Sequence, residues 1–254
     1  MNSAEKTAAL LKLLGQAPYV HGVTELGEKI GCSKSGTYKL LAALVQNGLA
    51  AQTVDRKYTL GPAVYILGKT YEDRIGLSRM IRPYLIRLRD LTGENASFSM
   101  LVGGKANLIY REESLQLVRV AGSVGQERPL YAGSTGKVLG AFQDEEEIRR
   151  RLMDEPLTPF TPRTITSPQA LLEEYAAIRK QGSAFSDGEL HIETIGIGAP
   201  VRDESGNVWA AISIGAPRMR VDDAKLDRYI FLVTEIAAEM SRDLTRGTVG
   251  DSLK

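Results

Sequence analysis

The first sixty residues carry the pattern that most constrains the fold, because they place two short amphipathic helices on either side of a tight turn. A helix precedes them, which Asn2 and Glu5 should begin as a capping box and Gly15 should end. The first of the two helices at the turn is predicted over residues 24–30, with Thr24 as its N-cap and Gly31 as its stop. Ser33 stands where the second helix should be capped. That helix carries an apolar stripe at helical spacing, made of Thr37, Leu40, Leu41 and Leu44. A helix, a short turn and a second helix is the helix-turn-helix arrangement.

The face of the second helix opposite this stripe is compatible with nucleic acid. No Asp or Glu occurs between Lys34 and Gln46. A helix that enters the major groove must offer donors to phosphates and base edges, whereas a merely solvated helix usually mixes both signs of charge. The residues on this face are Ser35, Tyr38, Lys39, Ala42 and Gln46. A phosphate is expected to bind at the start of the helix, because free amides and the helix dipole favour an anion there. The residues at this position are Ser33, Lys34 and Ser35.

Two short strands are predicted next, over residues 49–53 and 58–60, joined by a turn that carries Arg56 and Lys57. The two cations are either a DNA-contacting wing or ordinary soluble turn residues, and we favour the wing because it follows the helix-turn-helix directly. The candidate DNA-binding residues are therefore Thr24, Ser33, Lys34, Ser35, Thr37, Tyr38, Lys39, Arg56 and Lys57.

Charge and composition limit the classes of protein to which the chain can belong. Residues 1–60 carry a net charge of +3 in a chain whose total is +1, a small excess that gains meaning only from its position. No run of apolar residues is long enough for a membrane span and no signal peptide is recognisable, so a cytoplasmic protein is expected. The single cysteine, Cys32, with His21 and His191, predicts neither a structural metal nor a cofactor. Cys32 is either a redox switch or, as we favour, a small buried apolar residue.

A linker helix is expected over residues 62–77. Pro62 is suited to a first helical position, and one apolar face follows, made of Ala63, Ile66, Leu67 and Thr70. A free-standing helix must bury such a face, and pairing across a two-fold axis would also space two recognition helices by about one turn of DNA. A homodimer is therefore expected, with residues 1–61 as the DNA-binding domain.

Residues 78–254 predict an α+β domain. A helix from Ser78 to Thr92, with Met80, Tyr84, Leu88 and Leu91 as its apolar series, leads into a hairpin over residues 95–112. A second hairpin is expected over residues 195–214. Helices over residues 168–181 and 222–244 accompany them, and the first of these should begin after Ser167 and end at Gly182. Hairpins at both ends with helices between them indicate an antiparallel sheet flanked by helices.

The loop Gly133–Lys137 is the one segment of this domain that invites a chemical interpretation. It lacks the first glycine and the final Ser or Thr of a phosphate-binding P-loop, and the scarce histidines offer no base for an activated serine. No catalytic residue is therefore predicted, and the chain is not expected to be an enzyme. The loop either presents amides and hydroxyls to a ligand at a helix start or is a simple turn.

Several segments in the same order along nearly the whole chain resemble the IclR family of bacterial regulators. They are Thr24–Leu26, Ser33–Leu41, Tyr58–Gly61, Arg128–Lys137, Thr164–Thr166 and Ala211–Ile214. The resemblance implies a winged helix-turn-helix, a dimerising linker helix and a GAF-like effector domain, with dimers that pair into tetramers on palindromic operators.

The same resemblance implies an effector pocket. Its residues would be Leu117, Val120, Arg128, Ser134, Thr135, Ser186, Thr194, Gly196 and Ser213. Ser186 stands where many relatives have an aspartate and Gly196 where a cysteine occurs, so a different ligand is expected. Arg128 either pairs with a carboxylate or turns outward into solvent.

The leading hypothesis is a ligand-responsive repressor of a catabolic or metabolic operon, with a small organic, carboxylate-bearing effector and double-stranded operator DNA as partners. One alternative is a small-molecule enzyme with an appended DNA-binding module, which would need a reactive constellation in residues 80–250. Another is a constitutive DNA binder that uses the large domain only for assembly.

Overall fold

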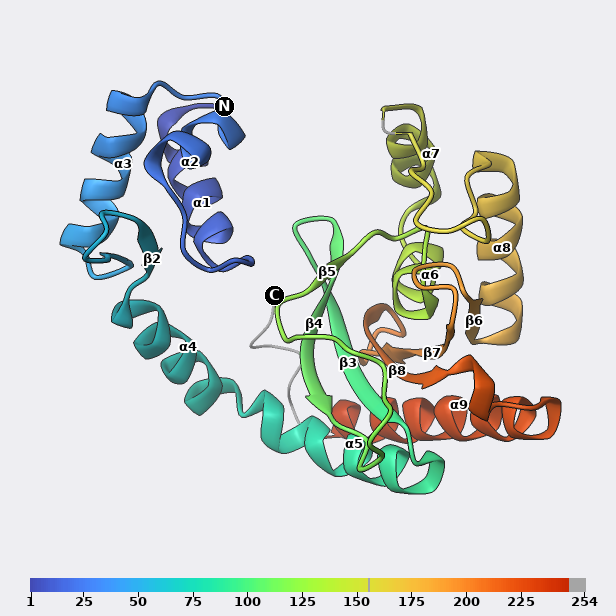
Figure 1. Ribbon diagram of the computed structural model, residues 1–254. Coiled ribbons are helices and arrows are strands. Elements are labelled where there is room, and N and C mark those ends of the chain that lie inside the picture. The colour runs from blue at the N-terminus through green and yellow to red at the C-terminus, as the bar shows by residue number, and fades with distance from the viewer. Residues whose placement is uncertain (155, 247–254) are drawn as a thin grey trace. The chain divides into compact units, whose positions relative to one another are not determined.

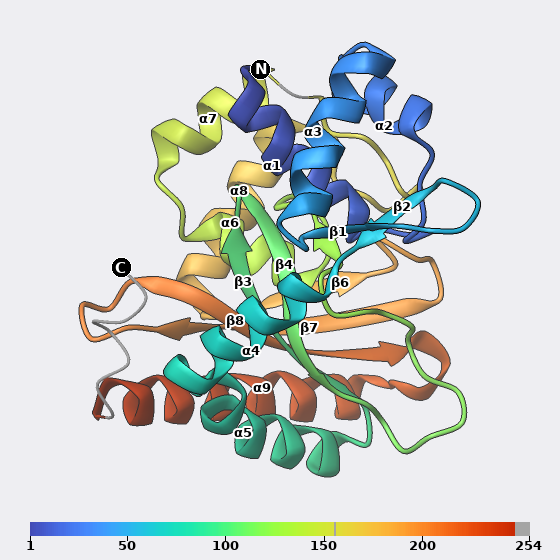
Figure 2. The same cartoon turned by 90° about the vertical axis from the view of Figure 1, so that its left-hand side faces the viewer.

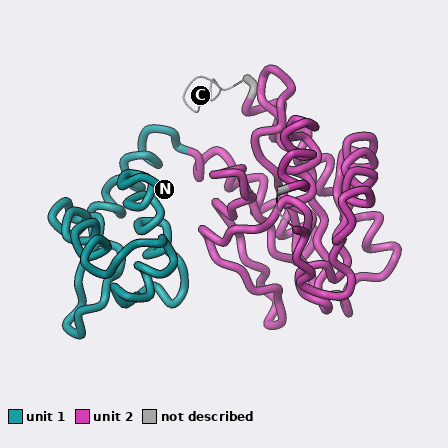
Figure 3. The backbone as a smooth tube through the Cα atoms, turned by 90° about the horizontal axis from the view of Figure 1, so that it is seen from above, with its two compact units in different colours: residues 1–76 teal, residues 77–254 magenta. Residues whose placement is uncertain are grey.

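The computed structural model describes residues 1–154 and 156–246. The chain divides into two compact units, Met1–Gly76 and Leu77–Lys254, which Figure 3 distinguishes by colour. Among the described helices, none has the length and apolar character needed to cross a membrane.

The first unit contains three helices, a two-stranded hairpin and a fourth helix (Figure 1). Its elements are α1 (Ser3–Leu14), α2 (Val23–Lys29), α3 (Lys34–Gln46), β1 (Ala50–Gln52), β2 (Tyr58–Leu60) and α4 (Pro62–Ile75). Asn2 and Glu5 form a capping box at the start of α1. The expected cap of α2 was wrong: Gly22 is the N-cap, with no side-chain hydrogen bond, and Thr24 lies exposed inside the helix.

The core of the helix-turn-helix is a single apolar cluster drawn from all three helices and the hairpin. Its buried members are Leu10, Leu14, Leu26, Ile30, Leu41, Leu44, Ala50 and Tyr58, and the partly buried Cys32 packs against them. Helices α2 and α3 lie close together at Gly27, where a Cβ would lie 2.9 Å from the Thr37 hydroxyl and 2.9 Å from the carbonyl oxygen of Cys32. Only a glycine permits this approach, which sets the position of α3 relative to α2.

Helix α4 has the predicted start at Pro62 and ends at Gly76, whose left-handed conformation (φ 67°) terminates it. None of its residues is buried. Tyr65, Ile66 and Leu67 are 76%, 62% and 61% exposed, which is unusual for three consecutive large apolar side chains. In the described chain this helix therefore leaves apolar surface uncovered.

The second unit is built on a six-stranded antiparallel sheet with strand order β5-β4-β3-β8-β7-β6. The strands are β3 (Asn95–Val102), β4 (Lys105–Glu112), β5 (Glu127–Arg128), β6 (Ala184–Asp187), β7 (Thr194–Arg202) and β8 (Val208–Pro217). Both predicted hairpins are confirmed, as β3/β4 and β7/β8, and β3 pairs with β8 to join them. The expected α+β class is thus confirmed.

Helices cover both faces of this sheet (Figures 1 and 2). Helices α5 (Leu77–Thr92) and α9 (Asp223–Arg246) pack on one face. On the other side are α6 (Ser134–Ala141), α7 (Glu145–Asp154) and α8 (Pro168–Gln181). A short 3₁₀ turn, η1 (Arg218–Arg220), precedes α9. Ser167 caps α8 and Gly182 ends it as predicted.

Candidate functional site

The outward face of α3 is exposed. Ser33 caps the helix by accepting a hydrogen bond from the amide of Gly36 at 3.2 Å. Tyr38 is 56% exposed, and Lys34, Ser35 and Lys39 are exposed as well. Within the described chain neither Lys34 nor Lys39 pairs with a carboxylate. The face thus presents two uncompensated ammonium groups and a phenol, which suits a phosphate backbone and the edges of bases.

Thr37 does not belong to this face. Its side chain is fully buried, and its hydroxyl donates a hydrogen bond to the carbonyl oxygen of Ser33 at 3.0 Å. The expectation that Thr37 contacts DNA is corrected by this placement, because the residue fills the α2–α3 crossing opposite Gly27. The sequence pattern already placed Thr37 in the apolar stripe of this helix. A residue of that stripe faces the core and cannot also face DNA.

The turn between β1 and β2 carries both predicted cations, in two different states. The ammonium of Lys57 lies 3.2 Å from a carboxylate oxygen of Asp55, and the Thr53 hydroxyl donates to the same carboxylate at 2.6 Å. The Thr53 hydrogen bond and the Lys57 contact lower the pKa of Asp55, so its carboxylate is charged at neutral pH. Arg56, at a positive φ of 59°, pairs with no carboxylate in the described chain. Arg56 is therefore the available cation of the turn.

We expect substitutions in this turn to move DNA affinity in opposite directions. Arg56→Ala should weaken binding about three- to tenfold, because it removes a phosphate contact. Asp55→Asn should strengthen binding by a similar factor, since it frees Lys57 while keeping an oxygen that accepts from Thr53. Fluorescence anisotropy with labelled DNA measures both, with thermal unfolding as a control for folding. Equal affinities for the two variants would show that the turn does not contact DNA.

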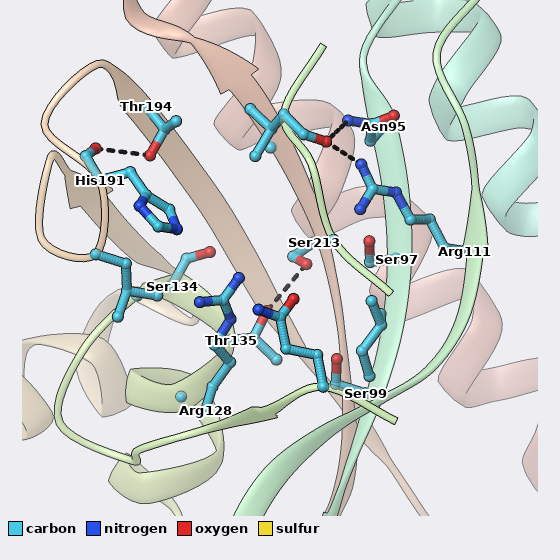
Figure 4. A pocket seen from close by; sticks show the side chains of 18 of the residues that line it. Asn95, Ser97, Ser99, Arg111, Arg128, Ser134, Thr135, His191, Thr194 and Ser213 are labelled. Carbon is cyan, nitrogen blue, oxygen red and sulfur yellow. Dashed lines mark hydrogen bonds between the residues drawn. The ribbon is translucent and has the colours of Figure 1, made fainter. Parts of the chain in front are cut away.

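In the second unit, a cavity opens between the sheet and the start of α6 (Figure 4). Its volume is about 130 Å³. Its floor follows the strand register, since Arg111 on β4 is paired with Ser97 on β3, which is paired with Ser213 on β8. Because side chains alternate along a strand, Asn95, Ser97 and Ser99 face the cavity while Ala96 and Phe98 are buried in the protein core. The floor is therefore polar.

The start of α6 forms the opposite wall. Gly133 precedes the helix with a φ of 77° and supplies no side-chain cap, so the first-turn amides have no capping acceptor from it. The Thr135 hydroxyl donates to Ser213 at 3.0 Å, as the dashed line in Figure 4 shows. Ser134 is buried against β7, where Gly196 and Gly198 leave room for it. Amides and hydroxyls at this helix start favour an anionic or carbonyl group.

Lys137, the last residue of the loop that resembles a P-loop, does not face the cavity as a phosphate ligand. Its side chain is 2% exposed, and its ammonium lies 2.5 Å from Glu189, 2.7 Å from Glu174 and 2.6 Å from the carbonyl oxygen of Phe185. The second oxygen of the Glu189 carboxylate accepts from the Gly133 amide at 2.9 Å. This buried network holds the segment leading to Leu190 and His191, two lining residues, against the start of α6.

Two arginines give the cavity its charge. Arg128 lines it, and burial, followed by the neighbouring charge of Arg111, lowers the pKa of Arg128. Burial likewise lowers the pKa of Arg111, which lines the cavity too and donates to the carbonyl oxygen of Val120. Both guanidinium groups remain charged at neutral pH. None of the lining residues is an aspartate or a glutamate.

The structure brings together most of the pocket residues expected from the sequence. Those that line the cavity are Val120, Arg128, Ser134, Thr135, Thr194 and Ser213. Three others do not line it. Leu117 is 96% exposed on the β4–β5 loop. Ser186 and Gly196 are paired across β6 and β7, and a side chain at Gly196 would meet the Ser134 hydroxyl at 2.8 Å, so Ser134 stands between Gly196 and the cavity. These placements correct the expectation for Leu117, Ser186 and Gly196.

Several lining residues were not predicted from the sequence, namely Asn95, Ser97, Ser99, Arg111 and His191. The three on β3 were detectable, because polar residues at every second position of a strand mark one polar face. Arg111 carried no such signal, since a strand near a sheet edge often has a solvated arginine. In the described part of the chain, no three His, Cys, Asp or Glu side chains gather to hold a metal ion.

Comparison with known proteins agrees with this architecture. Residues 3–53 match the model of the IclR helix-turn-helix domain, and residues 69–242 match that of the bacterial transcriptional regulator IclR C-terminal domain. The HTH-type transcriptional regulator BhcR of Paracoccus denitrificans is 30% identical over 86% of this chain and 79% of its own length.

Solved structures are similar to nearly the whole length of this chain. An IclR transcriptional regulator from Alicyclobacillus acidocaldarius has a TM-score of 0.84 and 26% identity, and covers 95% of this chain and 98% of its own. An IclR homologue from Microbacterium hydrocarbonoxydans, solved in complex with 4-hydroxybenzoate, has a TM-score of 0.79 and 21% identity, with 96% and 99% coverage.

The two matched domains account for both candidate sites, since the exposed face of α3 lies in the first and the cavity in the second. The chain therefore belongs to the IclR family of bacterial transcriptional regulators, as a ligand-responsive regulator that binds DNA through its helix-turn-helix.

Proposed function

We propose that the protein is a repressor that binds a palindromic operator as a homodimer and releases it when a small carboxylate-bearing effector occupies the cavity. The observation that carries the DNA-binding half is the exposed α3 face, in which Lys34 and Lys39 have no carboxylate partner within the described chain. The DNA residues proposed are Ser33, Lys34, Ser35, Tyr38, Lys39, Arg56 and Lys57, with Thr24 exposed at the first turn of α2.

Dimerisation is supported by α4. Its three exposed apolar side chains, Tyr65, Ile66 and Leu67, have no cover from the described chain, and an isologous contact with a second copy would bury them. Two copies of α3 would then address two half-sites about one DNA turn apart. Further pairing of dimers into tetramers on one operator is part of the same proposal.

The effector half is supported by the cavity. Guanidinium groups and free helix-start amides favour a carboxylate, and a cavity of about 130 Å³ admits a molecule about the size of a single ring. The IclR homologue from Microbacterium was solved with 4-hydroxybenzoate, which is a small carboxylate. Residues proposed to contact the effector are Val120, Arg128, Ser134, Thr135, Thr194 and Ser213.

Binding to DNA from the region upstream of the protein's own gene tests this function. Affinity should fall steeply as salt rises, because phosphate contacts release counterions, and it should exceed the affinity for unrelated DNA of equal length. A salt-sensitive preference for one DNA sequence supports the proposal. Equal affinity for all sequences at every salt concentration contradicts it.

We expect Ser134→Leu to abolish the effector response while DNA binding persists. Ser134 is buried at the cavity wall against Gly196 and Gly198 of β7, so a larger apolar side chain at this position removes a hydroxyl and has to displace the residues that shape the cavity. Gel-shift titration with and without an effector identified by screening measures the response. Ser205→Leu, on the exposed β7–β8 turn, is the matched control. A full response from Ser134→Leu would place the effector elsewhere.

A further inference from the structure

Within the described residues, the two guanidinium groups of the cavity form no ion pair, which distinguishes them from three other arginines of the same unit. Arg87, Arg89 and Arg220 each pair with a glutamate. The guanidinium of Arg128 makes no ion pair or hydrogen bond with the part of the chain that the structure describes. Arg111 donates to the carbonyl oxygen of Val120, and its buried Nε has no hydrogen-bond partner there.

In the part of the chain that the structure describes, no Asp or Glu lines the cavity to neutralise them. Glu113 is the acid that acts on Arg111, but it is 58% exposed and lies 3.1 Å from Arg119, with which it pairs. His191 also lines the cavity, and it adds no negative charge. The cavity therefore holds two positive charges. Burial, and after it the charge of Arg111, lowers the pKa of Arg128.

The two cations are separated in a way that suits two anionic groups. Arg128 comes from β5 and Arg111 from β4, and Figure 4 shows them on opposite sides of the space with Ser213 between them. Ser97 and Ser213 occupy the same row of the sheet as Arg111 and present hydroxyls to the middle of the cavity. An occupant with a charge at each end and a short polar or apolar centre matches this distribution.

We propose that the effector of this protein is a short dicarboxylate, with one carboxylate held by Arg128 and the other by Arg111. This rests on the proposed function of the cavity as an effector site and goes beyond it by naming a second anionic group and its partner. A dianion neutralises both guanidinium groups, whereas a monoanion leaves one of them buried without a counter-ion. The cavity volume of about 130 Å³ limits the ligand to a chain of about four to six carbons.

The test compares ligands that differ by one charge and little in size. Succinate and its monoamide succinamate, and glutarate and its monoamide glutaramate, are titrated into the full-length protein by calorimetry. At least one dicarboxylate should bind about tenfold more tightly than its monoamide, because each charge-assisted pair with a guanidinium adds affinity. Inorganic phosphate is included as a single dianionic group, and it should bind more weakly than that dicarboxylate.

Two variants test which arginine holds each carboxylate of the ligand. Arg111→Gln and Arg128→Gln should each reduce the preference for the dicarboxylate over its monoamide to about twofold or less. Arg79→Gln, which removes an exposed arginine of α5 outside the cavity, should leave the preference unchanged. The comparison of ligands on the unaltered protein needs no variant, so a variant that fails to fold does not decide the result.

The outcomes separate this inference from the proposed function. Dicarboxylates that bind no better than their monoamides, no binding of any dicarboxylate from malonate to adipate, or tighter binding of phosphate would each overturn the dicarboxylate. If a neutral or monoanionic compound then releases the protein from its operator, the proposed repressor function holds and only the dicarboxylate proposal fails. If the unaltered protein shows no sequence preference in DNA binding, the proposed function fails, whatever the cavity binds.

Discussion

Replacing Lys34 and Lys39 together by alanine is expected to weaken operator binding about 10- to 100-fold and to reduce the slope of log affinity against log salt by about 2. Both ammonium groups lie on the exposed face of α3 and pair with no carboxylate in the described chain, so each is available to a phosphate. Because neither side chain packs in the core, the temperature of thermal unfolding should stay within about 1 °C of the unaltered protein. Anisotropy titrations over a salt series provide both quantities.

The matched control is Lys180→Ala, which removes an exposed lysine from the last turn of α8 in the second unit. It changes the net charge by the same amount per residue and should leave DNA binding almost unaltered. A double variant that melts early would mean that α3 is rotated and that these lysines are structural. A double variant with normal affinity and normal salt slope would mean that another face of the first unit contacts DNA.

The second large effect is expected from Lys137→Met. The Lys137 ammonium is buried between Glu189 and Glu174, at 2.5 and 2.7 Å, and its removal leaves the 8%-exposed Glu189 carboxylate without its cation. Breaking a buried pair from one side costs about 3–5 kcal/mol of unfolding free energy. For a unit of this size the melting temperature should fall by about 6–20 °C. Calorimetric or fluorescence melting of the full chain measures the shift.

The double variant Lys137→Met, Glu189→Gln provides the internal control. It removes the stranded carboxylate as well, and the new side-chain amide would still offer an oxygen to the Gly133 amide, so part of the lost stability should return. Lys180→Met serves as the exposed counterpart and should melt like the unaltered protein. Unchanged melting of Lys137→Met would show that the network contributes no net stability.

Sequence patterns predicted those parts of the fold that depend only on interactions between residues close together in the chain. The capping box of Asn2 and Glu5 and the Ser167–Gly182 limits of α8 are confirmed, because a cap needs only neighbouring residues. Strands over 95–112 and 195–214 followed from alternation and turn residues. By contrast, the buried stripe of α5 is Leu77, Ile81, Leu85 and Leu88, not the expected series that included Met80 and Tyr84. The apolar residues of α5 lie on more than one face of the helix, and only packing against the sheet decides which face is buried.

The residues of the two candidate sites also divide into those that local sequence predicts and those that it does not. The exposed, carboxylate-free side of α3 was predictable, since one helix and its periodicity decide which residues point outward. The cavity was predictable only in part, because its residues come from β3, β4, β5, β7, β8 and α6, which are distant in sequence. Thr37 was misplaced because its burial depends on the close approach of α2 at Gly27, a contact between two elements.

What the sequence determined by itself was therefore the identity and limits of most helices and hairpins and the outward face of α3, all of which depend on side chains within a few residues of one another. The tertiary structure decided which residues enclose the cavity. It brought Arg111 and Arg128 to the same cavity and placed Ser134 between Gly196 and that cavity, because strand register and helix packing, not spacing along the chain, set those distances.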